Sequence, residues 1–65
     1  MAEKYYFEMG KGTLYHYDFY NEYYLVLESD NNIFKVLNLD RNRIETYIKE
    51  KINLNQVDKL RVVCE

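Results

Sequence analysis

The sequence predicts a mainly β protein with a single domain over residues 1–65, folded as a small SH3-like barrel or a strongly bent antiparallel sheet of five to six strands. The chain is short, and segments in which apolar and aromatic residues alternate with polar ones recur along it. Gly, Asn and Asp clusters separate these segments, and proline is absent. Many short strands joined by tight turns are typical of small barrels and bent sheets.

The first predicted strand covers residues 4–9, a run that is rich in aromatic residues and alternates in polarity. Gly10 and Gly12 end this strand with a turn. They are the two glycines of the chain, so this turn reaches positive φ without steric cost.

A hairpin is expected next, with strands over 13–19 and 23–28 joined by a three-residue loop at 20–22. In this register Tyr17 lies opposite Leu25, and one face of the hairpin is wholly apolar. A core-facing surface requires such a face, which is why we favour this loop length over a two-residue loop.

A turn over 29–32 follows, because Asp and Asn tolerate left-handed backbone and bond to their own main chain. The next strand is predicted over 33–39. A short helical turn is expected at 53–58, and a final strand is predicted over 59–64.

The segment 41–52 has two interpretations. In the first, Asn42 is left-handed in a tight turn and 44–48 is a fifth strand. In the second, Asp40 caps a helix whose apolar stripe includes Ile44 and Ile48. The second interpretation makes the protein α+β, with a four- or five-stranded antiparallel sheet and one helix at about 41–52.

Sequence motifs for enzymatic chemistry are absent: no phosphate-binding loop, no zinc-protease motif, no Cys-x-x-Cys and no nucleophile elbow. Cys64 and His16 are the single cysteine and histidine, which excludes an internal disulfide and argues against a structural zinc site. Cys64 is expected to be a small buried or half-buried residue. We therefore expect a protein that is not an enzyme and has neither cofactor nor metal.

Tyrosines are the most informative residues, since seven of the eight fall within the first 24 positions. Residues 1–30 also carry six acids against two bases, so the tyrosine-rich half is acidic. Tyrosine is enriched in protein interfaces, and an acidic face suits a basic partner. We predict a small protein-interaction module that binds a basic host protein through a face containing Tyr6, His16, Asp18, Tyr20, Glu22 and Tyr24.

An alternative function is nucleic-acid binding by a small barrel. Residues 31–65 carry seven bases against five acids, and this alternative uses Lys35, Arg41 and Arg43 together with an aromatic residue. Stacking platforms for single strands combine aromatic and basic residues, whereas the two kinds are segregated along this sequence. We therefore favour the protein partner over nucleic acid.

The run KGTLYHYDF at 11–19, followed by YLVL at 24–27, resembles the opening hairpin of MazF-like toxin endoribonucleases. Those proteins have an SH3-like barrel, and the resemblance implies this fold here. The arginine that the family carries after its first strand is missing, so the resemblance does not imply ribonuclease activity. A minimal toxin-like ribonuclease with His16 as a base beside Asp18 is a further alternative.

The source and setting of the chain follow from composition. Phe, Tyr, Met, Ile, Asn and Lys, whose codons are AT-rich, make up 30 of the 65 residues, which indicates a low-GC bacterium or its phages and mobile elements. An inhibitor or regulator from a phage or mobile element fits this setting. No apolar run reaches about 18 residues, so we expect no membrane span and a cytoplasmic location. So small a core also makes a homodimer an expected option.

Overall fold

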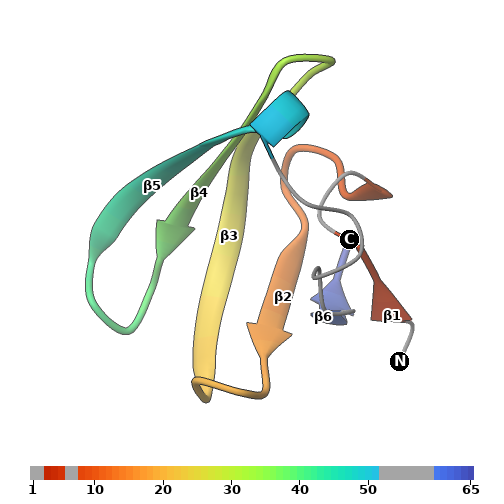
Figure 1. Ribbon diagram of the computed structural model, residues 1–65. Coiled ribbons are helices and arrows are strands. Elements are labelled where there is room, and N and C mark those ends of the chain that lie inside the picture. Colours follow the sequence, from red (N-terminus) through yellow and green to blue (C-terminus); the bar gives the residue numbers. More distant parts are fainter. Residues whose placement is uncertain (1–2, 6–7, 52–59) are drawn as a thin grey trace.

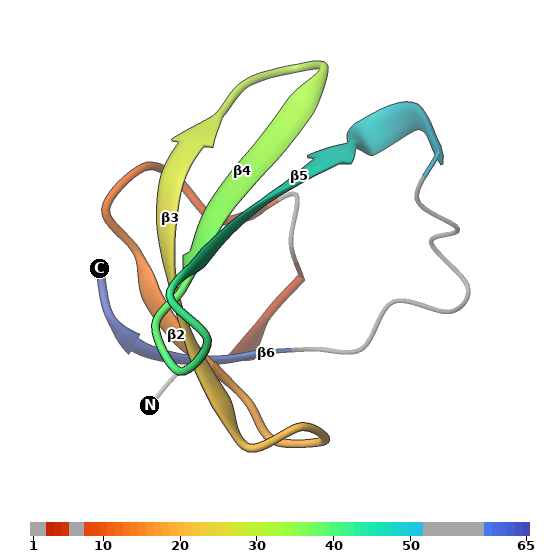
Figure 2. The same cartoon turned by 90° about the vertical axis from the view of Figure 1, so that its left-hand side faces the viewer.

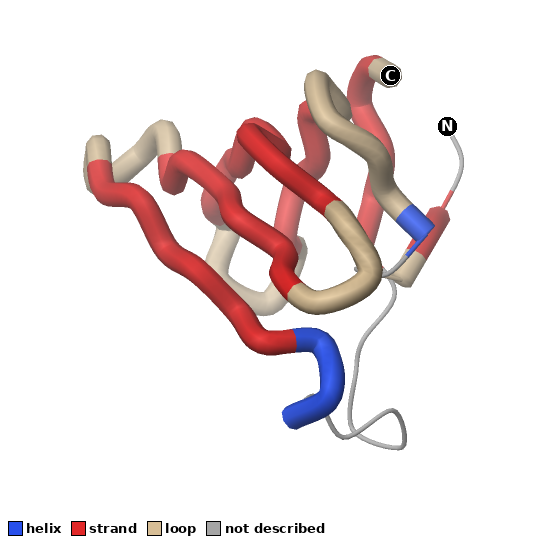
Figure 3. The backbone as a smooth tube through the Cα atoms, turned by 90° about the horizontal axis from the view of Figure 1, so that it is seen from above, coloured by secondary structure: helices blue, strands red, loops and turns tan. Residues whose placement is uncertain are grey.

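The computed structural model describes residues 3–5, 8–51 and 60–65. These residues form one antiparallel sheet in the order β1-β6-β2-β3-β4-β5 (Figure 1). A 3-10 turn, η2 (Lys49–Lys51), follows β5 (Arg43–Ile48) (Figure 3). The strands are β1 (Glu3–Lys4), β2 (Leu14–Tyr17), β3 (Glu22–Ser29), β4 (Ile33–Asn38), β5 (Arg43–Ile48) and β6 (Leu60–Cys64).

The sheet is an open, bent sheet, as one of the two predicted architectures requires. Strands β2 to β5 form a meander, and β6 returns to lie between β1 and β2 (Figure 1). The sheet curves so strongly that β6 runs at a steep angle to β3 and β4 (Figure 2). In the described part of the chain β1 and β5 are edge strands that do not pair with each other, so the sheet is not closed and agrees with the bent-sheet alternative.

Two irregularities in the ladder accompany this curvature. The register between β3 and β4 shifts between Val26 and Glu28, and the register between β2 and β6 shifts between Leu14 and Tyr15. Such bulges bend a strand and increase its twist. They favour a curled sheet over a flat one.

The segment after β4 is a strand, and the helix considered at 41–52 was wrong. Six consecutive residue pairs join β5 to β4, from Ile33 opposite Ile48 to Asn38 opposite Arg43. Asn42 has a φ of 52°, as the strand interpretation predicted. The pairing with β4 supplies ladder hydrogen bonds along the whole segment, and this outweighs the helical spacing of its isoleucines.

The β2–β3 hairpin has a different register from the one predicted. Tyr15 lies opposite Tyr24, and His16 lies opposite Tyr23. The loop therefore holds four residues, 18–21, rather than three. Asn21 has a φ of 53°, and its N–H bonds to the Asp18 carbonyl at 3.2 Å. Asparagine tolerates the left-handed conformation, so Asn21 can close a four-residue loop.

The remaining elements agree in part with the sequence. The turn at 29–32 forms as predicted, with Asp30 Oδ1 accepting from the N–H groups of Asn32 at 2.7 Å and Ile33 at 2.8 Å. Gly12 has a φ of 91°. The predicted final strand is present as β6, but Cys64 at its end is exposed and not buried.

The predicted first strand over 4–9 is found in part. Among its described residues only Lys4 pairs, within β1 (Glu3–Lys4), and the Glu8 N–H bonds to the Tyr5 carbonyl at 3.0 Å. The predicted helical turn at 53–58 lies outside the described residues. No helical segment among the described residues has the length and hydropathy needed to cross a membrane.

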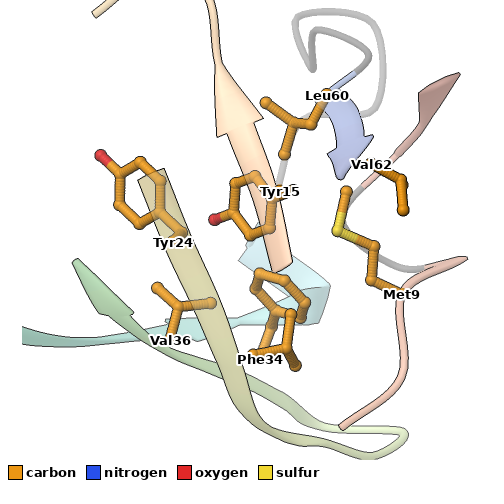
Figure 4. Close-up of a cluster of buried hydrophobic side chains, with 8 residues drawn as sticks. Met9, Tyr15, Tyr24, Phe34, Val36, Leu60 and Val62 are labelled. Atoms are coloured by element: carbon orange, nitrogen blue, oxygen red, sulfur yellow. The ribbon is translucent and has the colours of Figure 1, made fainter. Parts of the chain in front are cut away.

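The core lies on the inner face of the bent sheet (Figure 4). The rings of Tyr15 and Tyr24 are stacked with centroids 5.1 Å apart, and Phe34 tilts against Tyr15 at 6.4 Å. Because successive residues of a strand alternate faces, their neighbours point outward. The buried hydrophobic set is Met9, Tyr15, Tyr24, Val26, Phe34, Val36, Leu60 and Val62.

Part of the outer face of the sheet is also apolar. Leu25 lies opposite Leu37, and Leu37 lies opposite Ile44, which makes an apolar row across β3, β4 and β5. Ile44 is 57% exposed and Ile48 is 44% exposed. Ile44, Thr46 and Ile48 alternate along β5, so all three share this outer face.

Candidate functional site

A pocket of about 490 Å³ lies on the inner face, beside the core and next to the β2–β3 and β4–β5 turns. Its lining contains four tyrosines, two glutamates, two arginines and one asparagine. Hydroxyl, carboxylate, guanidinium and amide groups therefore meet around one cavity. The lining residues are Tyr17, Tyr20, Glu22, Tyr24, Asn38, Arg41, Arg43, Glu45 and Tyr47.

Glu22, at the start of β3, is held by two donors. The Tyr24 hydroxyl donates to Oε1 at 3.0 Å, and Arg41 Nε donates to Oε2 at 2.7 Å. The residue is buried to 9% exposure, which a carboxylate tolerates only when it is paired. The bond from Arg41, with smaller help from Tyr24 and Asn38, lowers the pKa of Glu22, so it stays ionised at neutral pH.

Glu45, on β5, repeats this arrangement on the other side of the pocket. The Tyr47 hydroxyl donates to Oε1 at 2.5 Å, and Arg43 Nη2 lies 3.5 Å from Oε2. Each glutamate thus has one tyrosine hydroxyl and one arginine. The pocket contains two such groups, and its four charges balance.

Asn38, at the end of β4, lies between these two groups. Across the sheet it is opposite Tyr24 on one side and Arg43 on the other. Its Oδ1 accepts the N–H groups of Asp40 and Arg41, each at 3.0 Å, which fixes the β4–β5 turn. The residue is 1% exposed, and its Nδ2 makes no hydrogen bond within the described residues.

Tyr24 links the pocket to the core. Its ring stacks on Tyr15, and its hydroxyl reaches Glu22. Burial, followed by the bond to the Glu22 carboxylate, raises the pKa of Tyr24 to about 12. The hydroxyl therefore stays protonated and acts as a donor throughout the physiological range.

Three aromatic rings gather at the β2–β3 loop, and we call Tyr17, Phe19 and Tyr20 the aromatic loop cluster. Tyr20 lies 5.0 Å from Tyr17 and 4.9 Å from Phe19, the latter edge-on. Phe19 is 77% exposed and Tyr20 is 58% exposed. These are the two most exposed large hydrophobic residues in the described part of the chain.

His16 lies apart from the pocket, on the outer face. Its ring tilts against Tyr23 at 4.6 Å and is 5% exposed. Nε2 contacts Asn21 Oδ1 at 3.0 Å, while Nδ1 contacts the Asp18 carboxylate and lies 3.0 Å from Arg61 Nη2. Both ring nitrogens are thus engaged within the chain, which gives His16 a structural role.

The predicted protein-binding residues are divided by the sheet. Tyr20, Glu22 and Tyr24 meet at the pocket, and among them only Tyr20 is largely exposed. His16 and Asp18 form a separate group with Arg61. Tyr6 lies outside the described residues.

The predicted nucleic-acid residues are also divided. Arg41 and Arg43 line the pocket, whereas Lys35 lies on the outer face opposite Thr46. Three pocket residues were not among the predicted site residues: Asn38, Glu45 and Tyr47. The alternation of Glu45 and Tyr47 along a strand was a usable signal, because residues two apart share a face.

The charges that are segregated along the sequence are mixed in the fold. Arg41 reaches Glu22 across 19 positions, and Arg61 Nη2 reaches Asp18 Oδ1 at 2.9 Å across 43 positions. The tyrosine-rich surface is therefore less acidic than the sequence halves indicated. Tyrosines and arginines meet in one place, which the segregated sequence did not predict.

Among the residues that the structure describes, no three His, Cys, Asp or Glu side chains lie close enough to hold a metal ion. Both pocket carboxylates are already paired with arginines, so the pocket is arranged for hydrogen bonding and ring contact. Comparisons with protein-family models, curated proteins and solved structures find no match to this chain.

Proposed function

We propose that this chain is a small non-enzymatic protein-interaction module that meets its partner through the aromatic loop cluster. The observation that carries the proposal is the exposure of Phe19 (77%) and Tyr20 (58%) on a hairpin loop. Large aromatic side chains that stay in water on a small protein mark interaction sites. Tyrosine is also enriched among the residues that dominate binding energy.

The fold holds this cluster in place. Tyr17 belongs to β2, and the loop bond from Asn21 to Asp18 fixes the turn between the rings. Because the rings already pack against one another, binding orders few additional side chains, which lowers the entropic cost of association.

The proposed partner presents an apolar surface beside a basic group. Asp18 lies between Tyr17 and Phe19 in sequence, and 68% of its side chain is exposed. Its contact with His16, and next the charge of Arg61, lower the pKa of Asp18, so it is ionised at neutral pH. A cation on the partner can reach this carboxylate while the rings bury apolar area. Inhibitors and regulators from phages or mobile elements, which act by covering a host protein, are the class we propose.

Affinity capture with a tagged chain tests this proposal. The bait is exposed to a lysate of a low-GC bacterium with and without nuclease, and bound proteins are identified by mass spectrometry. We expect one stoichiometric protein that survives nuclease and is lost with F19A and Y20A. The matched control is L39A, which removes a side chain of 47% exposure from the β4–β5 turn and should retain the partner.

Two results contradict the proposal. One is a partner that binds the folded F19A and Y20A variants as well as the parent protein. The other is a set of captured proteins that disappears entirely on nuclease treatment.

A further inference from the structure

The pocket has spare donors and no spare carboxylate. Each oxygen of Glu22 and Glu45 already has a tyrosine or arginine donor at 3.5 Å or less. The bond from Arg41 uses Nε, one of five N–H groups on a guanidinium. The Arg41 and Arg43 side chains are 60% and 62% exposed. A ligand of this pocket therefore gains most by offering acceptor oxygens, above all an anionic group that two arginines can contact.

Asn38 fixes the turn that presents Arg41. Its amide is buried at 1% exposure, and its Oδ1 accepts the N–H groups of Asp40 and Arg41. Its Nδ2 is covered by neighbouring protein atoms, so a ligand in the pocket does not reach it. Arg41 is therefore held at the pocket from a fixed turn.

The tyrosines supply the second requirement. Tyr17 and Tyr20 lie with ring centroids 5.0 Å apart at one side of the pocket, and Tyr20 is 58% exposed. Exposed aromatic rings beside arginines stack on flat heterocycles, as in single-strand binding proteins. A ligand that is only an anion would leave these rings unused.

We propose that the pocket binds a nucleoside phosphate, with the base against the tyrosine rings and the phosphate at Arg41 and Arg43. The same chemistry is offered by a free mononucleotide and by one nucleotide of a single strand. Other ligand classes fit less well. A cation would meet the two arginines, and an apolar ligand would bury charged groups without pairing them.

The site overlaps the proposed protein interface at Tyr17 and Tyr20, but Phe19 belongs to that interface alone. Phe19 does not line the pocket, so F19A should lose the protein partner and keep the nucleotide. Since the pocket charges balance and one nucleotide brings little phosphate, binding should depend only weakly on salt.

The first experiment titrates the ¹⁵N-labelled protein with AMP, GMP, CMP and UMP and follows amide and side-chain signals by NMR. We expect saturable shifts at the Arg41 and Arg43 Nε–H groups for at least one nucleotide. Inorganic phosphate and the matching nucleoside, titrated alone, should each bind at least about tenfold more weakly, because each makes only part of the contacts.

A pair of charge-matched variants locates the site. R43Q and K35Q each remove one positive charge, the first at the pocket and the second on the outer face. R43Q should weaken nucleotide binding about tenfold, while K35Q should leave it unchanged. Retention of the amide spectrum shows that each variant is folded.

Single-stranded tetranucleotides distinguish the two sources of the ligand. Tighter binding of a tetranucleotide than of its mononucleotide assigns the site to a strand, and equal binding assigns it to a free nucleotide. The proposal is overturned if no nucleotide shifts the pocket signals at millimolar concentration. It is equally overturned if phosphate alone binds as well, or if R43Q and K35Q behave alike.

Discussion

The carboxylate of Glu22 accepts a hydrogen bond from the hydroxyl of Tyr24, 3.0 Å away and two residues along the same strand. The Tyr24 ring lies in the core, where its polar end needs a partner, and Glu22 supplies one at the edge of the pocket. Arg41 completes the group from the β4–β5 turn. Glu22, Tyr24 and Arg41 thus form one hydrogen-bonded unit that joins the core to the wall of the pocket.

The first prediction concerns Tyr24 at high pH. Its pKa is raised to about 12 in the folded protein, while an unfolded tyrosine ionises near 10. The resulting stability is fully present below pH 10 and is lost as the pH rises toward 12, because only the unfolded chain releases this proton. The stability advantage of the parent protein over Y24F should therefore shrink between pH 10 and pH 12.

Urea denaturation of both proteins at several pH values measures this difference, and the other tyrosines cancel in the comparison. A constant gap between the parent protein and Y24F across this range would show that Tyr24 ionises like a solvent-exposed tyrosine.

The second prediction concerns Glu22 at low pH. Arg41 and Tyr24 lower its pKa, so its contribution to stability is present above the ordinary glutamate value and is lost as the pH falls through the folded value. E22Q should be less stable than the parent protein at pH 7, and the gap should narrow toward pH 3.

The matched control is E28Q, which removes the same charge from an exposed position of β3. It should leave the urea midpoint at pH 7 nearly unchanged. Equal losses in E22Q and E28Q would mean that the pairing with Arg41 adds nothing beyond general charge.

Local features of the sequence were sufficient to predict most of the strands. The turn at Asp30 and the left-handed conformation of Asn42 depend on interactions within a few residues of the chain, and both formed as predicted. The helical spacing of Ile44 and Ile48 was misleading in one of the two interpretations, because pairing with β4 is not visible within the segment itself. A local sequence pattern does not include the stabilisation that a segment gains by pairing with another strand.

The pocket was harder to predict because it depends on pairings between distant residues. Composition was sufficient to name Tyr20, Glu22 and Tyr24. The place of Asn38 in the pocket follows only from the strand pairing, which sets it between Tyr24 and Arg43. The register of the β2–β3 hairpin decides which tyrosines are buried. A loop that is one residue longer than predicted exchanges the core-facing and outward-facing side chains of a strand. For this reason His16 lies on the opposite face from Tyr24, with which it was predicted to form one surface.

The third prediction tests the place of β6 in the core. Leu60 is 1% exposed, and it comes from a strand that returns across the sheet after the described meander. L60A should lower the free energy of unfolding by about 2–5 kcal/mol, since it removes buried methyl groups and leaves a cavity. A thermal or urea melt measures the loss.

V63A is the control for this strand. Val63 is 41% exposed, so its truncation should change stability by less than about 0.5 kcal/mol. If the two variants lost equal stability, β6 would not present alternate faces to core and solvent as the structure requires.

The fourth prediction compares two asparagines that share a left-handed backbone but differ in their side-chain contacts. Asn42 and Asn21 have φ values of 52° and 53°, a region in which glycine has no steric cost. Asn21 Oδ1 also contacts His16 Nε2 at 3.0 Å, so its side chain holds the ring in place. N42G should be neutral or slightly stabilising. N21G should lose about 0.5–1.5 kcal/mol, the net contribution of one hydrogen bond.

Urea melts of both variants at pH 7 give the comparison, and chemical shifts of the His16 ring should move only in N21G. If N42G were as destabilised as N21G, backbone entropy rather than the histidine contact would account for both losses.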